Sequence, residues 1–499
     1  MRQLSSIMLV GTGSDVGKSV LVAALCRIFK QDGLNPAPFK AQNMALNSYA
    51  TPDGREIGRA QAMQAEAAGI DCETDMNPLL LKPQADHTSQ VVLHGVPQGS
   101  STAAELYRAE RRKQMRREVC AAYDRLAAKY NPIVLEGAGS ISEINLRAGD
   151  IVNLPMAHHA KAKVILVGDI DRGGVFASVY GSIMLQSPED RALIKGIIIN
   201  KFRGDMRLFD EGRRMMEELC GVPVLGVVPY FKDIHIEEED SVVLQNKERH
   251  WQSGKVNVAV VMLRHISNFT DFDALEHDDR IHLFYTANPS DLQHADIIVL
   301  PGSKTTISDL TALKQSGLST AIIEAHRRGK TIVGICGGYQ MMGTQVLDPL
   351  HIEGEMEVAR GLGLLPSITT LGEEKATRQV CFTLNVGEDR STVCHGYEIH
   401  QGHTVVNDCT DATPLLNFSD GKTDGLYVDD RCMGTYVHGI FDNRAFVDCL
   451  LRPFAKRIDS EPEPFDYQVF KQEQYDLLAE HVRQHVDIDA IYQIMQDND

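Results

Sequence analysis

The sequence lacks long hydrophobic runs. No stretch approaches the roughly 20 apolar residues that a membrane-spanning helix needs. The apolar run nearest the amino terminus is Ile7–Val10, which glycines follow directly. It therefore predicts a short strand and not a signal peptide. We expect a cytoplasmic protein with no membrane partner.

Paired cysteines are also absent. The 10 cysteines are scattered, with no CxxC pair and no spacing typical of a metal site. This pattern argues against a zinc-ribbon protein and against a disulfide scaffold. Most of the thiols should be buried and reduced, which favours a reducing compartment.

Basic residues are in deficit. Fifty Lys and Arg stand against 68 Asp and Glu, for a net charge of −18. Such a balance disfavours binding to nucleic acid or to an anionic membrane. One basic cluster, Arg108–Arg117, contains Glu110 and Met115 and is typical of a solvated helix face. Nucleic acid is therefore not an expected partner.

The length of the chain predicts two domains and a tail. With 499 residues and 43% hydrophobic content, the chain is too long for one ordinary core. A polar stretch with the single tryptophan predicts an interdomain linker. The expected division is a first domain at 1–244, a linker at 245–255, a second domain at 256–450 and a helical extension at 451–499.

Short apolar strands alternate with helical stretches in both halves. In the first half the predicted strands are Ile7–Val10, Ile133–Leu135, Val164–Val167, Ile197–Ile199 and Val224–Val228. In the second half they are Val258–Leu263, Ile297–Leu300, Thr331–Ile335 and Gly434–Val437. This alternation predicts the α/β class, with two doubly wound domains built on mainly parallel sheets. Ligands of such sheets bind beyond the carboxyl ends of the strands.

A glycine-rich loop follows the first strand and precedes an apolar-faced helix. Its candidate nucleotide-binding residues are Gly11, Thr12, Gly13, Gly17, Lys18 and Ser19. Backbone N–H groups of such a loop converge on phosphate oxygens, the lysine neutralises β/γ charge, and the serine hydroxyl can hold Mg²⁺. Thr12 departs from the usual pattern, which has glycine there. ATP and Mg²⁺ are the expected cofactors.

A magnesium site at this loop would also need a carboxylate. Glu136, just after a predicted strand, is the first candidate, and Asp169 at the end of another is the second. Each of them could instead cap a loop. The predicted metal-binding residues are thus Ser19, Glu136 and Asp169.

The second half carries a cysteine in a glycine-rich turn between a buried strand and a helix. Flanking glycines permit the strained turn that exposes a nucleophile, and a helix start stabilises a thiolate. Cys336 is therefore the candidate nucleophile, and His438 is the candidate base. Competing histidines are His265, His395, His400 and His403. The glycine-rich segment Leu300–Thr306 could supply a second oxyanion donor.

These residues resemble the class I glutamine amidotransferase pattern, in which a cysteine in G-x-C-x-G-x-Q hydrolyses glutamine to release ammonia. Gln340 matches the trailing glutamine. The class usually has His-x-Glu, but Ile440 occupies the glutamate position, so the third member of the triad is expected to be absent. Within the class, that lack is typical of the cobyrinate amidases.

The first half is similar to the dethiobiotin-synthetase-like P-loop enzymes, which phosphorylate a carboxylate. Further strings are FKAQNMALNSY (39–49), EIGRAQAMQAEAAG (56–69), VLEGAGS (134–140), DIDRGGVFAS (169–178), NKFRG (200–204), ISNFTDFDAL (266–275) and GYEIHQGHT (396–404). Together they resemble the glutamine-hydrolysing cobyric acid synthase family over nearly the whole chain. The resemblance implies amidation of the b, d, e and g carboxylates of the corrinoid adenosylcobyrinic acid a,c-diamide, with ATP and L-glutamine as co-substrates.

The nearest competitor is the a,c-diamide synthase of the same group, which usually carries a carboxylate-bearing segment where this chain is rich in amides. Those amides are Gln42, Asn43 and Asn47, with Gln61 and Gln64 downstream. They could contact the amidated rim of the corrin, or they could cap turns and helix ends. A rival of another class is a nucleotide-dependent scaffold with a degenerate amidotransferase module, against which the intact cysteine and histidine speak.

Overall fold

The computed structural model describes residues 4–85, 87–237, 250–407, 411–458 and 465–497, and these form two compact units. Of the described residues, unit 1 holds 4–45, 57–85, 87–237 and 471–497, and unit 2 holds 46–56, 250–407, 411–458 and 465–470. The predicted linker at 245–255 lies partly outside the described residues. Two segments depart from the expected division, because 46–56 joins the second unit and 471–497 joins the first.

The core of unit 1 is a six-stranded parallel sheet in the order β12-β11-β10-β1-β9-β2. Its strands are β1 (Ile7–Gly11), β2 (Ala37–Phe39), β9 (Ile133–Glu136), β10 (Lys163–Asp169), β11 (Ile194–Phe202) and β12 (Val224–Pro229). All five strands predicted for the first half are confirmed. Their apolar, often β-branched residues are buried on both faces, as parallel sheets require.

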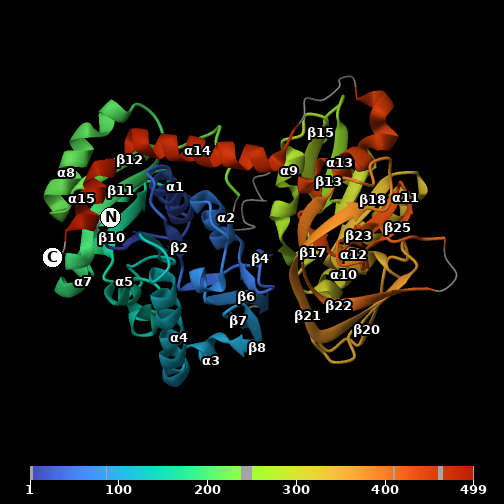
Figure 1. The fold of residues 1–499 in the computed structure, drawn as a ribbon, viewed down its shortest axis with the longest axis horizontal. Coiled ribbons are helices and arrows are strands. Elements are labelled where there is room, and N and C mark those ends of the chain that lie inside the picture. Colours follow the sequence, from blue (N-terminus) through green and yellow to red (C-terminus); the bar gives the residue numbers. More distant parts are fainter. Residues whose placement is uncertain (1–3, 86, 238–249, 408–410, 459–464, 498–499) are drawn as a thin grey trace. The chain divides into compact units, whose positions relative to one another are not determined.

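Helices cover this sheet on both faces (Figure 1). The helices of unit 1 are α1 (Lys18–Gln31), α2 (Arg59–Ala68), α3 (Ala103–Leu106), α4 (Ala109–Ala127), α5 (Leu154–Ala160), α6 (Val175–Met184), α7 (Pro188–Leu193), α8 (Asp210–Cys220), α14 (Tyr467–His485, from residue 471 onward) and α15 (Ile488–Gln496). Gly33, with φ +80°, follows the C-cap residue Asp32 at the end of α1.

The last two helices belong to the core of unit 1. Leu478 and Val482 of α14 and Ile491 of α15 pack in one apolar cluster with residues of α1. Arg27 of α1 also donates to Asp476 at 2.7 Å. The region expected as an appended extension is thus, from residue 471 onward, an integral part of the first unit (Figure 1, red).

Unit 1 carries a second, smaller sheet that was not predicted. Its order is β3-β6-β7-β8, with β3 (Gln42–Met44), β6 (Leu79–Ala85), β7 (Thr88–Leu93) and β8 (Val96–Thr102). Strands β3 and β6 are parallel, and the other pairs are antiparallel.

Unit 2 also contains a six-stranded sheet, in the order β15-β13-β16-β18-β26-β25. Its strands are β13 (Val256–Val261), β15 (Ile281–Thr286), β16 (Ile297–Leu300), β18 (Thr331–Ile335), β25 (Leu426–Asp429) and β26 (Cys432–Thr435). Only the pair β25–β26 is antiparallel. The predicted strand at 434–437 is divided between β26 and β27 (Val437–His438).

The other large sheet of unit 2 was not predicted. Its long members β21 (Ser367–Leu384) and β22 (Cys394–Val406) pair antiparallel, as Figure 1 shows in orange. The same sheet also contains β19 (Gln345–Leu347), β20 (Val358–Arg360), β23 (Leu416–Phe418), β24 (Thr423–Asp424) and β27. Two separate two-stranded sheets are formed by β14 (Ile266–Ser267) with β17 (Gly302–Ser303), and by β4 (Ser48–Ala50) with β5 (Glu56–Gly58). The helices are α9 (Asp273–Glu276), α10 (Thr306–Gln315), α11 (Leu318–Arg327), α12 (Gly337–Met342) and α13 (Arg444–Leu451).

Within the described ranges, no helix is both long and apolar enough to span a bilayer. The same residues contain no cluster of His, Cys, Asp and Glu arranged to hold a metal ion.

Candidate active site

The glycine-rich loop of unit 1 connects the end of β1 to the start of α1. Gly17 has φ +93°, a conformation that favours glycine. A Cβ on Gly11 would lie 2.7 Å from the carbonyl oxygen of Gly13, so the loop closes too tightly for a side chain there. Thr12 is not among the positive-φ residues of the described chain, which explains why threonine is tolerated where the usual pattern has glycine.

The lysine of the loop folds back over the cradle. Lys18 Nζ donates to the carbonyl oxygens of Gly13 at 2.9 Å and Gly139 at 3.1 Å. Ser140 Oγ donates to the carbonyl of Thr12 at 2.8 Å, so the loop after β9 braces the loop after β1. The ammonium group therefore lies at a helix start lined by backbone N–H groups, which suits a polyphosphate.

Glu136 lies buried at the centre of a polar cluster behind the loop. Its Oε1 accepts from Ser19 Oγ and from Lys40 Nζ, both at 2.8 Å, and its Oε2 accepts from Gln64 Nε2 at 2.7 Å. Burial by itself raises the pKa of Glu136, but the Lys40 charge and these hydrogen bonds outweigh burial and lower it. The carboxylate is therefore ionised, and with the Ser19 hydroxyl it forms the kind of oxygen donor set that Mg²⁺ prefers.

Asp169 has different partners. It lies 3.3 Å from Lys201 and accepts from the backbone N–H of Asp171 at 2.8 Å. Of the three predicted metal-binding residues, Ser19 and Glu136 are brought together, whereas Asp169 forms an ion pair at the end of β10. Lys40 was missed, although it directly follows the short strand β2.

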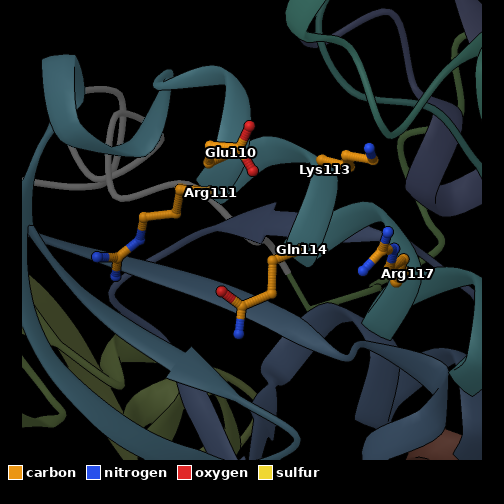
Figure 2. Close-up of a pocket in the computed structure, with 5 residues that line it drawn as sticks. All are labelled: Glu110, Arg111, Lys113, Gln114 and Arg117. Atoms are coloured by element: carbon orange, nitrogen blue, oxygen red, sulfur yellow. The ribbon is translucent and has the colours of Figure 1, made fainter.

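The basic cluster of the first half lies on α4. Figure 2 shows a hollow lined by Glu110, Arg111, Lys113, Gln114 and Arg117, all from this one helix. The side chains of Arg111 and Lys113 point in opposite directions. This arrangement agrees with the prediction of a solvated helix face.

In unit 2, Cys336 lies in a strained turn between β18 and α12. Its φ of 50° with ψ of −108° is a conformation that non-glycine residues rarely adopt. A Cβ on Gly337 would lie 2.8 Å from the backbone nitrogen of Ser303, and one on Gly338 would lie 2.0 Å from the carbonyl oxygen of Leu300. The two glycines are therefore needed for the turn to pack against this segment.

That neighbouring segment is part of the predicted oxyanion loop, Leu300–Thr306. Its strand β17 pairs with β14, and a Cβ on Gly302 would lie 3.3 Å from Cε1 of His438. The cysteine turn, the glycine-rich loop and the histidine thus converge on one place in unit 2.

His438 is buried. Its Nδ1 lies 2.7 Å from Oδ2 of Asp271, and the nearby Cys336 side chain also affects its pKa. Burial lowers the pKa of His438, but the charges of Asp271 and Cys336 outweigh this effect and raise the pKa from 6.5 to about 10. The imidazole is therefore a cation at neutral pH.

The prediction that this site lacks a third acidic member is wrong. Asp271 lies in a short 3-10 helix, Phe269–Phe272, and is 3% exposed. Its Oδ1 also accepts from the backbone N–H of Gly439 at 3.0 Å. The carboxylate that class I enzymes usually place two residues after the histidine comes here from a distant loop.

The competing histidines have other partners. His265 pairs with Asp309 at 3.0 Å, His395 lies 3.4 Å from the exposed Cys381, and His400 stacks on Tyr436 with ring centroids 3.7 Å apart. His403 lies on β22. Geometry therefore favours His438 as the partner of the cysteine.

Gln340 braces the cysteine turn from behind. Its Nε2 donates to the carbonyl of Gln401 at 2.9 Å and to Tyr436 Oη at 3.2 Å, and its Oε1 accepts from Thr306 Oγ1 at 3.1 Å. The trailing glutamine of the motif thus connects α12 to the oxyanion loop and to β22.

The five amides singled out in the first half have different hydrogen-bond partners. Asn47 is 1% exposed and accepts from the backbone N–H of Asn268 at 2.7 Å, so it caps a turn in unit 2. Gln42 accepts from Arg112 at 2.9 Å. Asn43 donates to Gln61 at 3.0 Å, and Gln64 belongs to the Glu136 cluster.

Comparison with known proteins decides between the remaining interpretations. Residues 7–243 match the CobQ/CobB/MinD/ParA nucleotide binding domain, and residues 257–446 match the CobB/CobQ-like glutamine amidotransferase domain. Cobyric acid synthases of Bacteroides fragilis and Phocaeicola vulgatus are 64% and 62% identical, each over 100% of both chains. That of Salmonella heidelberg is 47% identical over 98% of both. The chain belongs to the cobyric acid synthase family.

As a member of the cobyric acid synthase family, the chain is an enzyme of the glutamine amidotransferase class with a nucleotide-binding domain. Ser19, Glu136 and Asp169 fall in the nucleotide-binding match, and Asp271, Cys336 and His438 fall in the amidotransferase match. Each cluster is therefore built within the domain whose chemistry it suits.

Proposed function

We propose that this enzyme amidates the b, d, e and g carboxylates of adenosylcobyrinic acid a,c-diamide in cobalamin biosynthesis, using ATP and nitrogen from L-glutamine. The observation that carries the proposal is the pairing of a Cys336–His438–Asp271 constellation with a phosphate cradle in a chain that aligns end to end with cobyric acid synthases. A cytoplasmic location is part of the proposal, because the nine described cysteines are free thiols.

Nitrogen release begins at the sulfur. Cys336 Sγ attacks the amide carbon of glutamine and forms a tetrahedral oxyanion, which backbone N–H groups of the cysteine turn and of Gly302–Ser303 stabilise. The C–N bond then breaks as His438 Nε2 gives its proton to the leaving nitrogen. The Nδ1 bond to Asp271 fixes the tautomer and the orientation that this transfer needs. Water hydrolyses the resulting thioester to glutamate.

The acid is activated in the other unit. A carboxylate is a poor electrophile, so the acceptor takes the γ-phosphoryl group of ATP to become an acyl phosphate, which ammonia then attacks with loss of phosphate. Lys18 would neutralise the phosphate charge, and Ser19 with Glu136 would hold Mg²⁺, whose charge supports the transfer. Lys40 also donates to Glu136, so this carboxylate would serve both the lysine and the metal.

Two buried amide atoms support a role in acceptor binding. Gln61 Nε2 and Gln64 Oε1 have no hydrogen-bond partner within the described residues, although both side chains are 0% exposed. Buried polar atoms are normally satisfied, and a bound ligand is one way to satisfy them. We assign these two glutamines to the acceptor, whereas Asn47 has a turn-capping role.

The test separates the two half-reactions. Cys336→Ser should lose amidation from glutamine but keep it with added ammonia, and Lys18→Ala should lose both, because activation precedes nitrogen transfer. Products are followed by mass spectrometry from the diamide, with ATP present. A scaffold protein would show neither activity in the wild type. Substantial ammonia-dependent product from Lys18→Ala would contradict the role of the loop.

A further inference from the structure

The segment 46–56 leaves unit 1 after Ala45, packs in unit 2, and returns to unit 1 at Ile57. In sequence it lies between β3 and α2, far from any amidotransferase motif. Yet its side chains contact the residues that support all three members of the cysteine site, as the following contacts show.

The first contact holds the loop of Asp271. Asn47 Oδ1 accepts from the backbone N–H of Asn268 at 2.7 Å, and Asn268 Oδ1 accepts from the backbone N–H of Ser48 at 2.9 Å. All three residues are buried. Asn268 has φ +53° and immediately precedes the 3-10 helix that carries Asp271. Without Asn47, a buried N–H at a strained turn would lose its acceptor, and the turn would relax.

The second contact lies behind the histidine. The ring of Tyr49 packs on Tyr397 with centroids 4.5 Å apart, and Tyr397 in turn stacks on His438 at 5.3 Å with an interplanar angle of 22°. Tyr397 is also the strand partner of His438. The imidazole is thus backed by two aromatic rings, of which the outer one comes from the segment 46–56.

The third contact approaches the cysteine. Ala50 packs with Tyr397 and Ile399 in a small apolar cluster, and the carbonyl oxygen of Ile399 lies 3.6 Å from Cys336 Sγ. Gln379 Nε2 donates to the carbonyl of Ala50 at 3.0 Å, and Lys375 forms a buried ion pair with Glu56. These bonds fix the middle and the carboxyl-terminal end of the segment against β21.

We infer that residues 47–50 are a positioning element of the glutaminase site, with Asn47 holding the Asp271 loop and Tyr49 backing the His438 ring. The inference rests on the proposed function of that site. Neither residue touches glutamine in this scheme. Each acts through another side chain, so its loss should impair the chemical step more than substrate binding.

The test compares Asn47→Ala, Tyr49→Ala and Tyr49→Phe with Asp53→Asn, an exposed position in the same segment. Both alanine variants should lower kcat for glutamine hydrolysis by about 10- to 100-fold with little change in the KM for glutamine, as small misplacements of catalytic groups do. Tyr49→Phe keeps the ring and should restore most of the rate. Asp53→Asn should match the wild type. Amidation with added ammonia should persist in all four.

A normal kcat in both alanine variants would overturn the inference. A rise in the KM for glutamine with kcat unchanged would also overturn it. A loss by Tyr49→Phe equal to that of Tyr49→Ala would also count against it, because the ring contact would then be irrelevant. Wild-type protein that hydrolyses no glutamine would instead refute the proposed function. The two failures are therefore distinguishable.

Discussion

Replacing Asp271 by asparagine should shift the pH dependence of glutamine hydrolysis. The carboxylate lies 2.7 Å from His438 Nδ1 in a fully buried site. For charges about 4 Å apart and an effective dielectric constant of about 20, the attraction is about 4 kcal/mol, or about three pKa units. This is close to the rise in the pKa of His438 from 6.5 to about 10. Asp271 is therefore the main source of that rise.

Without that charge the pKa of His438 should fall, because burial disfavours the imidazolium and only the influence of Cys336 remains to raise it. The wild-type enzyme should keep the histidine protonated until the pH approaches 10, and its rate should fall only above that value. At pH 8 a smaller fraction of the Asp271→Asn enzyme should then hold the proton. Because general acid catalysis contributes about 10²- to 10⁴-fold, the glutaminase kcat should fall by about 10-fold or more at pH 8 and by less at pH 6.

The assay is steady-state release of glutamate from glutamine between pH 5.5 and 10.5. Asp279→Asn, an exposed carboxylate on the same stretch of chain, is the matched control and should leave the profile unchanged. Amidation from added ammonia should be preserved in both variants. An alkaline limb that stays near pH 10 in Asp271→Asn would refute the reasoning, because another group would then set the charge of His438.

Two further predictions concern stability. Leu478→Ala should destabilise unit 1 by about 2–5 kcal/mol, because Leu478 is fully buried in its core. Leu477→Ala, at the exposed neighbouring position, should change the stability little, and thermal unfolding of the two variants tests this. Burial raises the pKa of Asp424 from 3.8 to about 6, so the folded protein holds a proton that the unfolded chain releases, and stability falls as the pH rises between these values. Asp424→Asn should therefore increase the free energy of unfolding at pH 8 by up to about 3 kcal/mol and raise the melting temperature there, but it should change neither at pH 4. Equal effects at both pH values would contradict this.

The sequence was sufficient for the main sheets and for the two reactive turns. Runs such as Val164–Val167 are apolar and β-branched, and such runs predict buried parallel strands whatever surrounds them. Cys336 and His438 could be paired in advance because each follows a strand end. In the structure β18, which precedes Cys336, is the neighbour of β26, which ends shortly before His438, with Ile335 aligned to Thr435.

The long hairpin β21–β22 could not be predicted in the same way. Much of β21 is half-exposed, and residues such as Glu373 and Lys375 break any simple alternation of apolar and polar positions. The extended conformation of β21 depends on its pairing with β22. The packing of α14 against unit 1 could not be predicted for a related reason. An apolar helix face shows that the helix packs against a core, but not which core that is.

Asp271 and Asn47 show a different limit. A carboxylate that orients a histidine from 167 residues away in the sequence leaves no periodic signal. The motif at 438–440 therefore led to the wrong prediction that the site has no acidic member. An asparagine that caps a buried turn has the same side chain as one that binds a ligand, and the sequence left both roles open for Asn47. Its acceptor bond to Asn268 favours the first role. Because this bond and the ring of Tyr49 support both partners of the cysteine, a stretch of the first half of the chain belongs physically to the site of the second.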